Sequence, residues 1–221
     1  MKSTRVGWIV AIGLVLALPA VAAAQGVYVG IHGGPAFGEN VTITGGLFGT
    51  VEREYSGEFG IAGAVGYAFT IPVRVEAEFT YLRRNLNQRT VVFECPVYVS
   101  GGILLGGSGH VEHFLYMANV YYDVIVPFLG GFKPYVGAGL GYAGNTEQVT
   151  GPVLTESDRH GSFAYQFKGG IAYALTRSVE VSAGYRYIHI GGDTRGTIFG
   201  RPLTVDPARV HMLEFGVAYK F

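Results

Sequence analysis

The stretch VHMLEFGVAYKF, residues Val210–Phe221, alternates between apolar side chains and polar or small ones. Counting back from Phe221, every second residue is apolar, namely Tyr219, Val217, Phe215 and Leu213. A period of two is the pattern of a β-strand with one apolar face. The termini of water-soluble domains usually fray into solvent, so a strand this apolar at the end of a chain is unusual for a soluble domain.

The same alternation recurs in eight segments. Each is close to the roughly 9–11 residues that a tilted strand needs to cross a bilayer. Aromatic residues fall toward the segment ends and aliphatic residues toward the middle, which is typical of two interfacial girdles. A soluble β-sandwich also alternates, but it has no reason to place tyrosine at both rims of its buried face. The segments are Gly26–Phe37, Glu58–Phe69, Val73–Arg84, His113–Asp123, Lys133–Ala143, Ser162–Ala174, Ser178–Ile190 and Val210–Phe221.

The connections between these segments alternate in length. Three are short: Thr70–Pro72, Val124–Phe132 and Leu175–Arg177. Four are long and rich in Gly, Thr and Asn: Gly38–Gly57, Asn85–Glu112, Gly144–Gly161 and Gly191–Arg209. Short periplasmic turns and long outer loops are typical of outer-membrane barrels, and strands in hydrocarbon must close so that every backbone group is paired. The sequence therefore predicts an all-β fold, an eight-stranded antiparallel transmembrane up-and-down β-barrel over residues 25–221, with both termini periplasmic.

The first 25 residues, MKSTRVGWIVAIGLVLALPAVAAAQ, have the layout of a secretory signal. Lys2 and Arg5 precede an uncharged apolar run, Val6–Val21, and three alanines follow it. We expect a cleaved signal peptide over residues 1–24, with Ala22 and Ala24 forming the cleavage pattern. A transmembrane anchor is the alternative, but the run is shorter than the roughly 20 residues that a span needs. Export and an alternating barrel together predict the bacterial outer membrane as the location.

Composition excludes several classes of function. The chain has 16 basic and 16 acidic residues, and because Lys2 and Arg5 leave with the signal, 14 basic residues remain. This balance gives no reason to expect nucleic-acid binding. The single cysteine, Cys95, excludes an internal disulfide and argues against a structural metal cluster.

The faces opposite the apolar ones carry the charged residues. An eight-stranded barrel is just wide enough for interior side chains to fill it, and buried charges persist only when they are paired and hydrogen-bonded. We therefore predict a plug of ion pairs rather than a conducting pore, with inward glycines making room for the long side chains. The predicted network is Arg74, Glu76, Glu78, Lys168, Glu180, Arg186, Glu214 and Lys220, with His32, Arg84, Asn119, Asp123 and Gln166 also inward. A catalytic carboxylate cluster is the other interpretation, but substrates could not reach it.

Four stretches carry a family resemblance: GVYVGIHGG (Gly26–Gly34), PYVGAGLGYA (Pro134–Ala143), VEVSAGYRYIHIG (Val179–Gly191) and the ending EFGVAYKF. With them the chain resembles the small eight-stranded outer-membrane barrels, the porin-like or opacity and surface-antigen family. The resemblance implies that the ending is an assembly signal, formed by Glu214, Gly216, Tyr219 and Phe221. It also implies recognition by the barrel-assembly machinery and periplasmic chaperones. Family members serve as structural proteins, adhesins and conduits for small or apolar solutes, so the resemblance does not fix an activity.

Histidines and a few acidic residues are the remaining candidates for chemistry. His110, His113, His160, His189 and His211 lie near the predicted outer rim, but their spacing follows no known metal motif. Lipid A deacylases resemble this architecture and need a lipid-facing histidine and serine. His189 and His211 face outward by parity, whereas Ser162, Ser178 and Ser182 do not, so the catalytic geometry is missing. Asp158 lies two positions before His160 in a charged loop. A single acidic residue near a histidine in such a loop is usually just solvated. We therefore predict no enzyme activity, no cofactor and no metal.

The second long loop, which contains Cys95, is unusually apolar. Three structures suit it: a strand extension protruding beyond the membrane, a cap over the barrel mouth, or an adhesive sheet edge. We favour a protruding hairpin.

These observations predict an integral outer-membrane protein with a structural or surface-interaction role carried by its loops. A narrow porin or a conduit for small apolar solutes is the alternative function, and a lipid A-modifying enzyme is the third. The expected partners are outer-membrane lipid and lipopolysaccharide, together with an extracellular ligand held by the loops.

Overall fold

The computed structural model describes residues 26–39, 41–44, 50–95, 99–105, 108–124, 130–150, 155–198 and 201–221. The described chain consists of β-strands joined by turns and short irregular segments. The strands are β1 (Val27–Gly38), β2 (Val41–Thr44), β3 (Thr50–Ala68), β4 (Val73–Cys95), β5 (Val99–Leu105), β6 (Ser108–Asp123), β7 (Phe132–Thr150), β8 (Thr155–Ala174), β9 (Val179–Ile190), β10 (Asp193–Ile198), β11 (Arg201–Val205) and β12 (Ala208–Lys220). In this described part, no helix is both long and apolar enough to cross a membrane.

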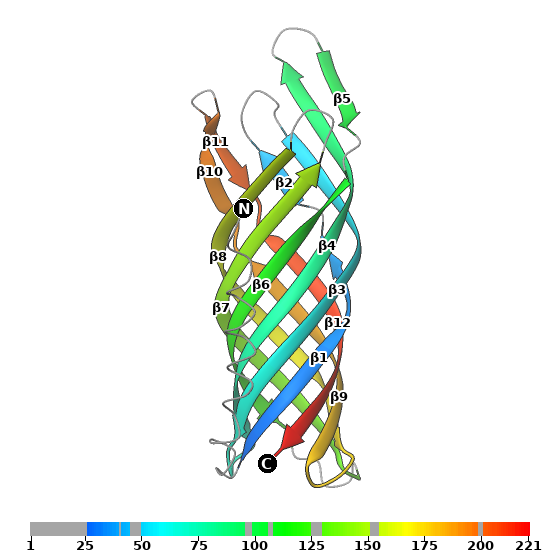
Figure 1. The fold of residues 1–221 in the computed structure, drawn as a ribbon, viewed down its shortest axis with the longest axis vertical. Coiled ribbons are helices and arrows are strands. Elements are labelled where there is room, and N and C mark those ends of the chain that lie inside the picture. Colours follow the sequence, from blue (N-terminus) through cyan, green and yellow to red (C-terminus); the bar gives the residue numbers. More distant parts are fainter. Residues whose placement is uncertain are drawn as a thin grey trace, which may run out of the picture.

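Eight of the strands form a closed antiparallel barrel (Figure 1). In the order in which neighbours pair, they are β1, β3, β4, β6, β7, β8, β9 and β12. The barrel closes between its first and last strands, where Tyr28 lies opposite Lys220 and Gly38 lies opposite Val210. Closure leaves no unpaired edge along the barrel wall. The predicted eight-stranded up-and-down barrel is confirmed.

The strand boundaries agree with the sequence at one end of the barrel and differ at the other. At the end that carries the short turns, here the short-turn end, every barrel strand begins or stops within one residue of its predicted segment. At the opposite, long-loop end, β3, β4, β6, β7 and β8 run well beyond the predicted segments. The prediction that these residues form loops was wrong for most of them. Their Gly, Thr and Asn content suggested coil, but backbone pairing continues, for example between Thr50 and Val92.

Four additional strands complete the long-loop end. β2 pairs with β3, β11 with β2, and β10 with β11, so one side of the barrel continues upward as a sheet. β5 pairs with the outer part of β4 from Arg89 opposite Leu105 to Cys95 opposite Val99. This β4–β5 hairpin extends past the level at which β6 and β7 begin to pair, and Figure 1 shows it as the far tip of the molecule. The backbone thus forms the protruding hairpin that we expected; the Cys95 side chain lies outside the described residues.

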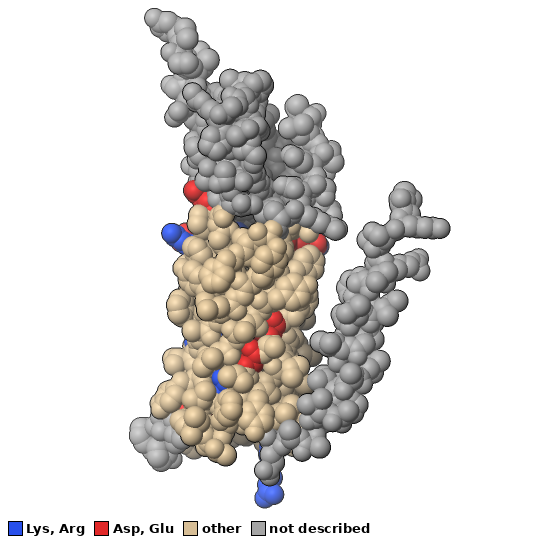
Figure 2. All heavy atoms as spheres, turned by 90° about the vertical axis from the view of Figure 1, so that its left-hand side faces the viewer, with Lys and Arg blue, Asp and Glu red and all other residues tan. Residues whose placement is uncertain are grey.

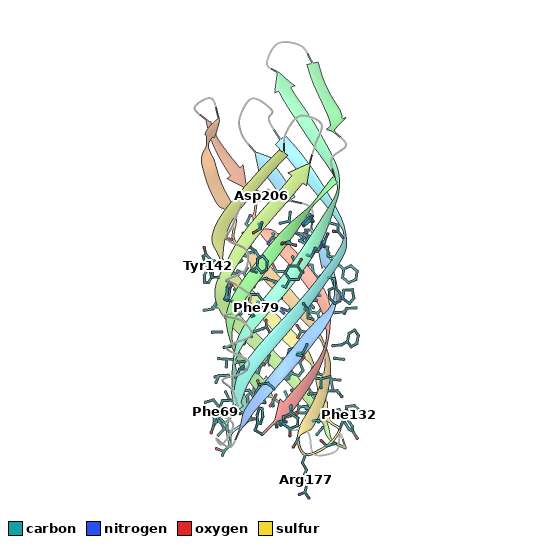
Figure 3. All side chains as sticks on the ribbon, viewed as in Figure 1. Phe69, Phe79, Phe132, Tyr142, Arg177 and Asp206 are labelled. Carbon is teal, nitrogen blue, oxygen red and sulfur yellow. The ribbon has the colours of Figure 1, made fainter. Side chains whose placement is uncertain are left out.

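The outer wall of the barrel is apolar. Along β7 the outward side chains Phe132, Val136, Leu140 and Tyr142 are 51 %, 56 %, 60 % and 55 % exposed, with rings at the two ends and aliphatic groups between them. Figure 3 shows Phe69 and Phe132 near the short-turn end and Tyr142 closer to the long-loop end. On the side seen in Figure 2, most of the described wall is uncharged. This is the surface expected of a barrel surrounded by lipid.

Candidate functional site: the interior of the barrel

The inward face of β4 spans the barrel interior from the short-turn end upward. Successive side chains of a strand point to opposite faces, so every second residue of β4 enters the lumen. These residues are at most 9 % exposed, and the layers of the interior can be described in their order. They are Arg74, Glu76, Glu78, Thr80, Leu82 and Arg84.

The lowest layer is a chain of five charges beside the short turns. Arg74 donates from Nε to Oδ1 of Asp123 at 3.0 Å. Lys133 Nζ bridges the two acidic groups, at 3.5 Å from Oδ2 of Asp123 and 2.8 Å from Oε2 of Glu180. Lys220 Nζ, at 2.5 Å, also binds Oε2 of Glu180. Five strands, β4, β6, β7, β9 and β12, are therefore linked through charge at this end, and the last of them is the closing strand.

Above this layer, rings surround a carboxylate. Glu76 accepts hydrogen bonds from the hydroxyls of Tyr28 at 3.0 Å and Tyr121 at 2.9 Å. The guanidinium carbon of Arg74 lies 4.9 Å from the centre of the Tyr121 ring and 5.5 Å from that of Tyr135, which is cation–π geometry. The three tyrosines point inward, unlike the exposed rings of the outer wall, and they fill this section of the lumen.

Two glycines provide the space that these inward rings need. A Cβ on Gly66 would lie 2.2 Å from Cζ of Tyr28, and one on Gly137 would lie 2.4 Å from Cδ1 of Tyr121. Only glycine fits opposite the rings. The inward glycines therefore make room for tyrosines here, in addition to the long charged side chains for which we expected them.

At mid-height, four charges from four strands meet across the lumen. Glu78 of β4 lies 2.5 Å from Lys168 Nζ of β8 and 2.7 Å from Nη2 of Arg186 of β9. Glu214 of β12 lies 3.2 Å from each of the same two cations. Nη2 of Arg186 also donates to Oγ1 of Thr80 at 3.0 Å. The Arg186 side chain is 0 % exposed, so this central cluster (Glu78, Lys168, Arg186 and Glu214) lies deep in the interior.

A layer of apolar side chains lies across the lumen above the central cluster. It is built around Leu82, Leu115, Ile188 and Met212, which are all completely buried. The sequence analysis did not anticipate this layer, although its residues share the inward parity of the charged ones. The full set is Ala36, Leu82, Leu115, Met117, Ala143, Ala164, Ile188, Ile190, Val210 and Met212.

A polar layer lies above the apolar one. Nε of Arg84 donates to Oε1 of Glu58 at 2.9 Å, and its Nη2 donates to the Glu39 carbonyl at 3.0 Å. On the other side of the lumen, Nδ1 of His113 lies 2.7 Å from Oδ1 of Asn145. One apolar layer thus separates the charged layers below it from the polar layer above it, and each charge in these layers has a partner of opposite sign or a hydrogen bond.

A small cavity remains beside the ring layer. Its volume is about 20 Å³, and its lining includes His32, Glu76, Ser182 and Glu214. That is room for roughly one water molecule. Nδ1 of His32 lies 3.8 Å from Oε1 of Glu214, too far for a direct hydrogen bond.

The structure brings the predicted interior residues together in groups. Arg74, Glu180 and Lys220 belong to the lowest layer, Glu76 to the ring layer, and Glu78, Lys168, Arg186 and Glu214 to the central cluster. Sequence reasoning missed Lys133, Glu58 and the inward tyrosines. Their parity was available as a signal: Lys133 and Tyr135 alternate with the lipid-facing Phe132 and Val136, so both point inward.

A model of the family described as outer membrane protein beta-barrel domain matches residues 9–221, nearly the whole chain. The chain belongs to this family. PagN, an outer membrane protein of Salmonella typhimurium, is 31 % identical over 155 residues, which cover 64 % of this chain and 62 % of PagN. An uncharacterized Brucella suis protein is 31 % identical over 147 residues, 58 % of this chain and 50 % of that protein. The chain thus spans about half the length of such curated relatives.

Solved structures agree with the barrel. Neisserial surface protein A superposes with a TM-score of 0.54 at 21 % identity, over 89 % of this chain and 98 % of that one. The outer membrane protease OmpT of Escherichia coli gives 0.54 at 8 % identity, over 90 % and 98 %. At these identities the likeness shows the fold alone. Family and fold together make this an outer-membrane β-barrel protein, as expected from the sequence.

The proposed assembly-signal residues of this outer-membrane barrel divide between its two faces. Glu214 lies inside, in the central cluster. Gly216 faces the lumen as well, where a Cβ would lie 2.3 Å from Nδ1 of His32. Tyr219 and Phe221 lie outside, 48 % and 50 % exposed, with ring centres 5.2 Å apart. Ala22 and Ala24 lie outside the described residues.

The residues considered for catalysis do not converge. His189 and His211 face outward on β9 and β12, whereas Ser182 lines the interior cavity. The side chains of Asp158 and His160 lie outside the described residues. Within the described ranges, no group of three His, Cys, Asp or Glu residues is arranged to hold a metal ion.

Proposed function

We propose that this protein is an integral outer-membrane barrel with a closed lumen, and that its role is structural or interactive at the cell surface. The observation that carries the proposal is the interior: Arg186, bound by Glu78 and Glu214, is completely buried, and an apolar layer lies directly above it. A continuous water path through the lumen would need both layers to open. The surface role then belongs to the strands and loops of the long-loop end.

The placement in the membrane follows from the outer wall. Apolar side chains with aromatic residues at both ends suit a bilayer with two interfaces. We infer that the signal peptide is removed after residue 24 and that the short turns lie in the periplasm. We also infer that the assembly machinery and its chaperones recognise a signal at the end of the chain, formed by Glu214, Gly216, Tyr219 and Phe221. The long-loop end, including the β4–β5 hairpin, then lies outside the cell, where it would meet an extracellular ligand.

The absence of enzyme activity is part of the proposal. The outward histidines contact aromatic side chains, and Nδ1 of His211 is hydrogen-bonded to the Tyr185 hydroxyl. No serine hydroxyl in the described part of the wall is hydrogen-bonded to either histidine. The two layers across the lumen also weigh against the alternative functions of a narrow porin or a conduit for small apolar solutes.

The single cysteine offers a direct test of the orientation. Cys95 ends β4, at the outer part of the β4–β5 hairpin. We expect a membrane-impermeant maleimide to label intact cells that express the protein. The matched control is a Cys95→Ser variant carrying Arg177→Cys, because Arg177 lies at the tip of a short turn (Figure 3). That control should react only after the outer membrane is permeabilised, and the reverse pattern would contradict the proposed placement.

A further inference from the structure

The outer wall carries a cluster of basic and aromatic side chains that the closed lumen does not explain. It lies on three adjacent strands, β8, β9 and β12, beside the ends of β9 and β12 at the long-loop end. Because the three strands are paired, these side chains form rows across them. His189 lies opposite both Tyr165 and Arg209, and Tyr187 lies opposite His211. We name these side chains the outer patch: Tyr165, Tyr185, Tyr187, His189, Arg209 and His211.

Ring contacts hold the two imidazoles of the outer patch in place. The His189 ring stacks on Tyr165 with centres 4.6 Å apart and planes 17° from parallel. The His211 ring lies 5.3 Å from Tyr187, and its Nδ1 is hydrogen-bonded to the Tyr185 hydroxyl. When Tyr185 is the donor of that bond, Nε2 of His211 carries the hydrogen and is left as a donor. The patch thus presents ordered donors on a surface where most side chains have none.

Apolar side chains adjoin the outer patch and continue along the wall toward the short-turn end. Phe167 is opposite Tyr187, and Phe37 is opposite His211. With Leu213 and Phe215 they form an apolar surface, each between 47 % and 61 % exposed. Because a row of donors stands at the upper border of an apolar wall, the surface matches a molecule with a polar head and acyl chains.

We propose that the outer patch binds the phosphomonoester headgroup of an outer-leaflet glycolipid, with its acyl chains on the apolar wall below. The proposal rests on the membrane placement proposed above. Arg209 is the main anchor, because a guanidinium recognises phosphate oxygens with two parallel hydrogen bonds. The imidazoles of His189 and His211 add donors on the neighbouring strand positions.

One carboxylate stands beside the site. Glu39 Oε2 lies 3.2 Å from Nη1 of Arg209, and both side chains are more than half exposed. Exposed ion pairs contribute little to stability, so a phosphate with nearly two negative charges can displace this carboxylate. Glu39 therefore weakens binding in this arrangement, and its removal should strengthen it.

The test measures lipid retained by the full chain in detergent, by native mass spectrometry. The probes are lipid A carrying its phosphates and the same lipid A after dephosphorylation. We expect the phosphorylated lipid to bind, Arg209→Gln to weaken binding about tenfold, as for loss of one charged hydrogen-bonding partner, and Glu39→Gln to strengthen it. Arg83→Gln, an exposed change on β4 away from the three patch strands, is the control and should leave binding unchanged.

The outcomes separate this site from the barrel itself. Each variant is first shown to be folded by its heat-modifiable gel mobility, so failure of the barrel is detected before lipid is added. Equal retention of dephosphorylated lipid A, or equal loss of binding in Arg83→Gln and Arg209→Gln, would overturn the site. Displacement of the lipid by inorganic phosphate at matching concentration would overturn the assignment to a lipid.

Discussion

Arg186 shows what one buried charge requires in this barrel. A guanidinium removed from water costs several kcal/mol unless its neighbours replace the lost hydration. Arg186 reaches Glu78, Glu214 and Thr80 with its two terminal nitrogens. Lys168 balances the second negative charge, at 2.5 Å from Glu78 and 3.2 Å from Glu214. Each member of the cluster is thus stable in the interior only while the others are present.

Removal of one member should therefore destabilise the barrel. For Arg186→Met we expect a loss of about 3–5 kcal/mol in the free energy of unfolding, because Glu78 and Glu214 then share one cation. Guanidinium-induced unfolding in detergent micelles measures this. Arg209→Met, at an exposed pair, is the matched control and should change stability by less than about 1 kcal/mol.

A second variant separates charge balance from packing. A quadruple variant removes all charges of the central cluster. Its substitutions are Glu78→Leu, Lys168→Met, Arg186→Met and Glu214→Leu. Apolar replacement of a complete buried cluster is often neutral or stabilising, so we expect it to recover most of the stability lost in Arg186→Met. A quadruple variant less stable than Arg186→Met would show that the ion pairs contribute net stability.

Glycine positions in the barrel wall differ in the space that an added Cβ would have. A Cβ on Gly137 would meet Cδ1 of Tyr121 at 2.4 Å, whereas one on Gly63 would meet nothing within 4 Å. We expect Gly137→Ala to lower stability by about 1–3 kcal/mol, as overpacked interiors do. Gly63→Ala is the control and should be neutral in the same unfolding assay. Equal effects of the two changes would contradict the proposed packing of Tyr121.

At the scale of elements, the alternation of side chains along a strand was predicted better than the length of the strand. The alternation fixed which side chains of β4 enter the lumen, because a strand inside a closed barrel cannot rotate without exposing Arg74 or Glu78 to lipid. The outer ends of strands were not predictable in the same way. In these outer parts Thr, Asn and Glu occur with no fixed period in the sequence, while the backbone continues to pair.

The β4–β5 hairpin should be separable from the barrel. Asn85 of β4 lies opposite His110 of β6, and the pairing between these two strands ends one residue further on, at Leu86 opposite Gly109. We expect replacement of residues 87–108 by a tight two-residue turn to leave a folded barrel, shown by retained heat-modifiable mobility. A variant that no longer folds would make the hairpin part of the barrel nucleus rather than a surface element.

The closing strand β12 has a structural role, and we propose that its end is also an assembly signal. Glu214 and Gly216 have interior contacts that explain them without any signal, whereas Tyr219 and Phe221 are lipid-facing. We expect Phe221→Ser to lower the amount of barrel in the outer membrane while refolding of the purified chain is unchanged, and Phe221→Trp to behave as the parent chain. An equal loss in both assays would assign Phe221 to stability alone.

At the scale of the whole molecule, the interior has a layered order that residue types alone did not reveal. The balance of basic and acidic residues on the inward faces predicted ion pairs. In the structure, paired residues from different strands lie at the same height in the lumen. The apolar layer was not predicted, because parity places Leu82 and Ile188 inside the barrel but does not show that they meet at one height. Only the closed barrel, by bringing β4, β6, β9 and β12 around one axis, places their side chains together.

The central claim is that this lumen is closed, and ion conductance through the reconstituted protein tests it most directly. The folded chain is inserted into a planar bilayer at known protein content, and current is recorded with voltage applied in both directions. The layers at Arg186 and Leu82 predict no current above that of the protein-free bilayer. Steady, ion-selective openings of uniform size would show an open path and contradict the claim.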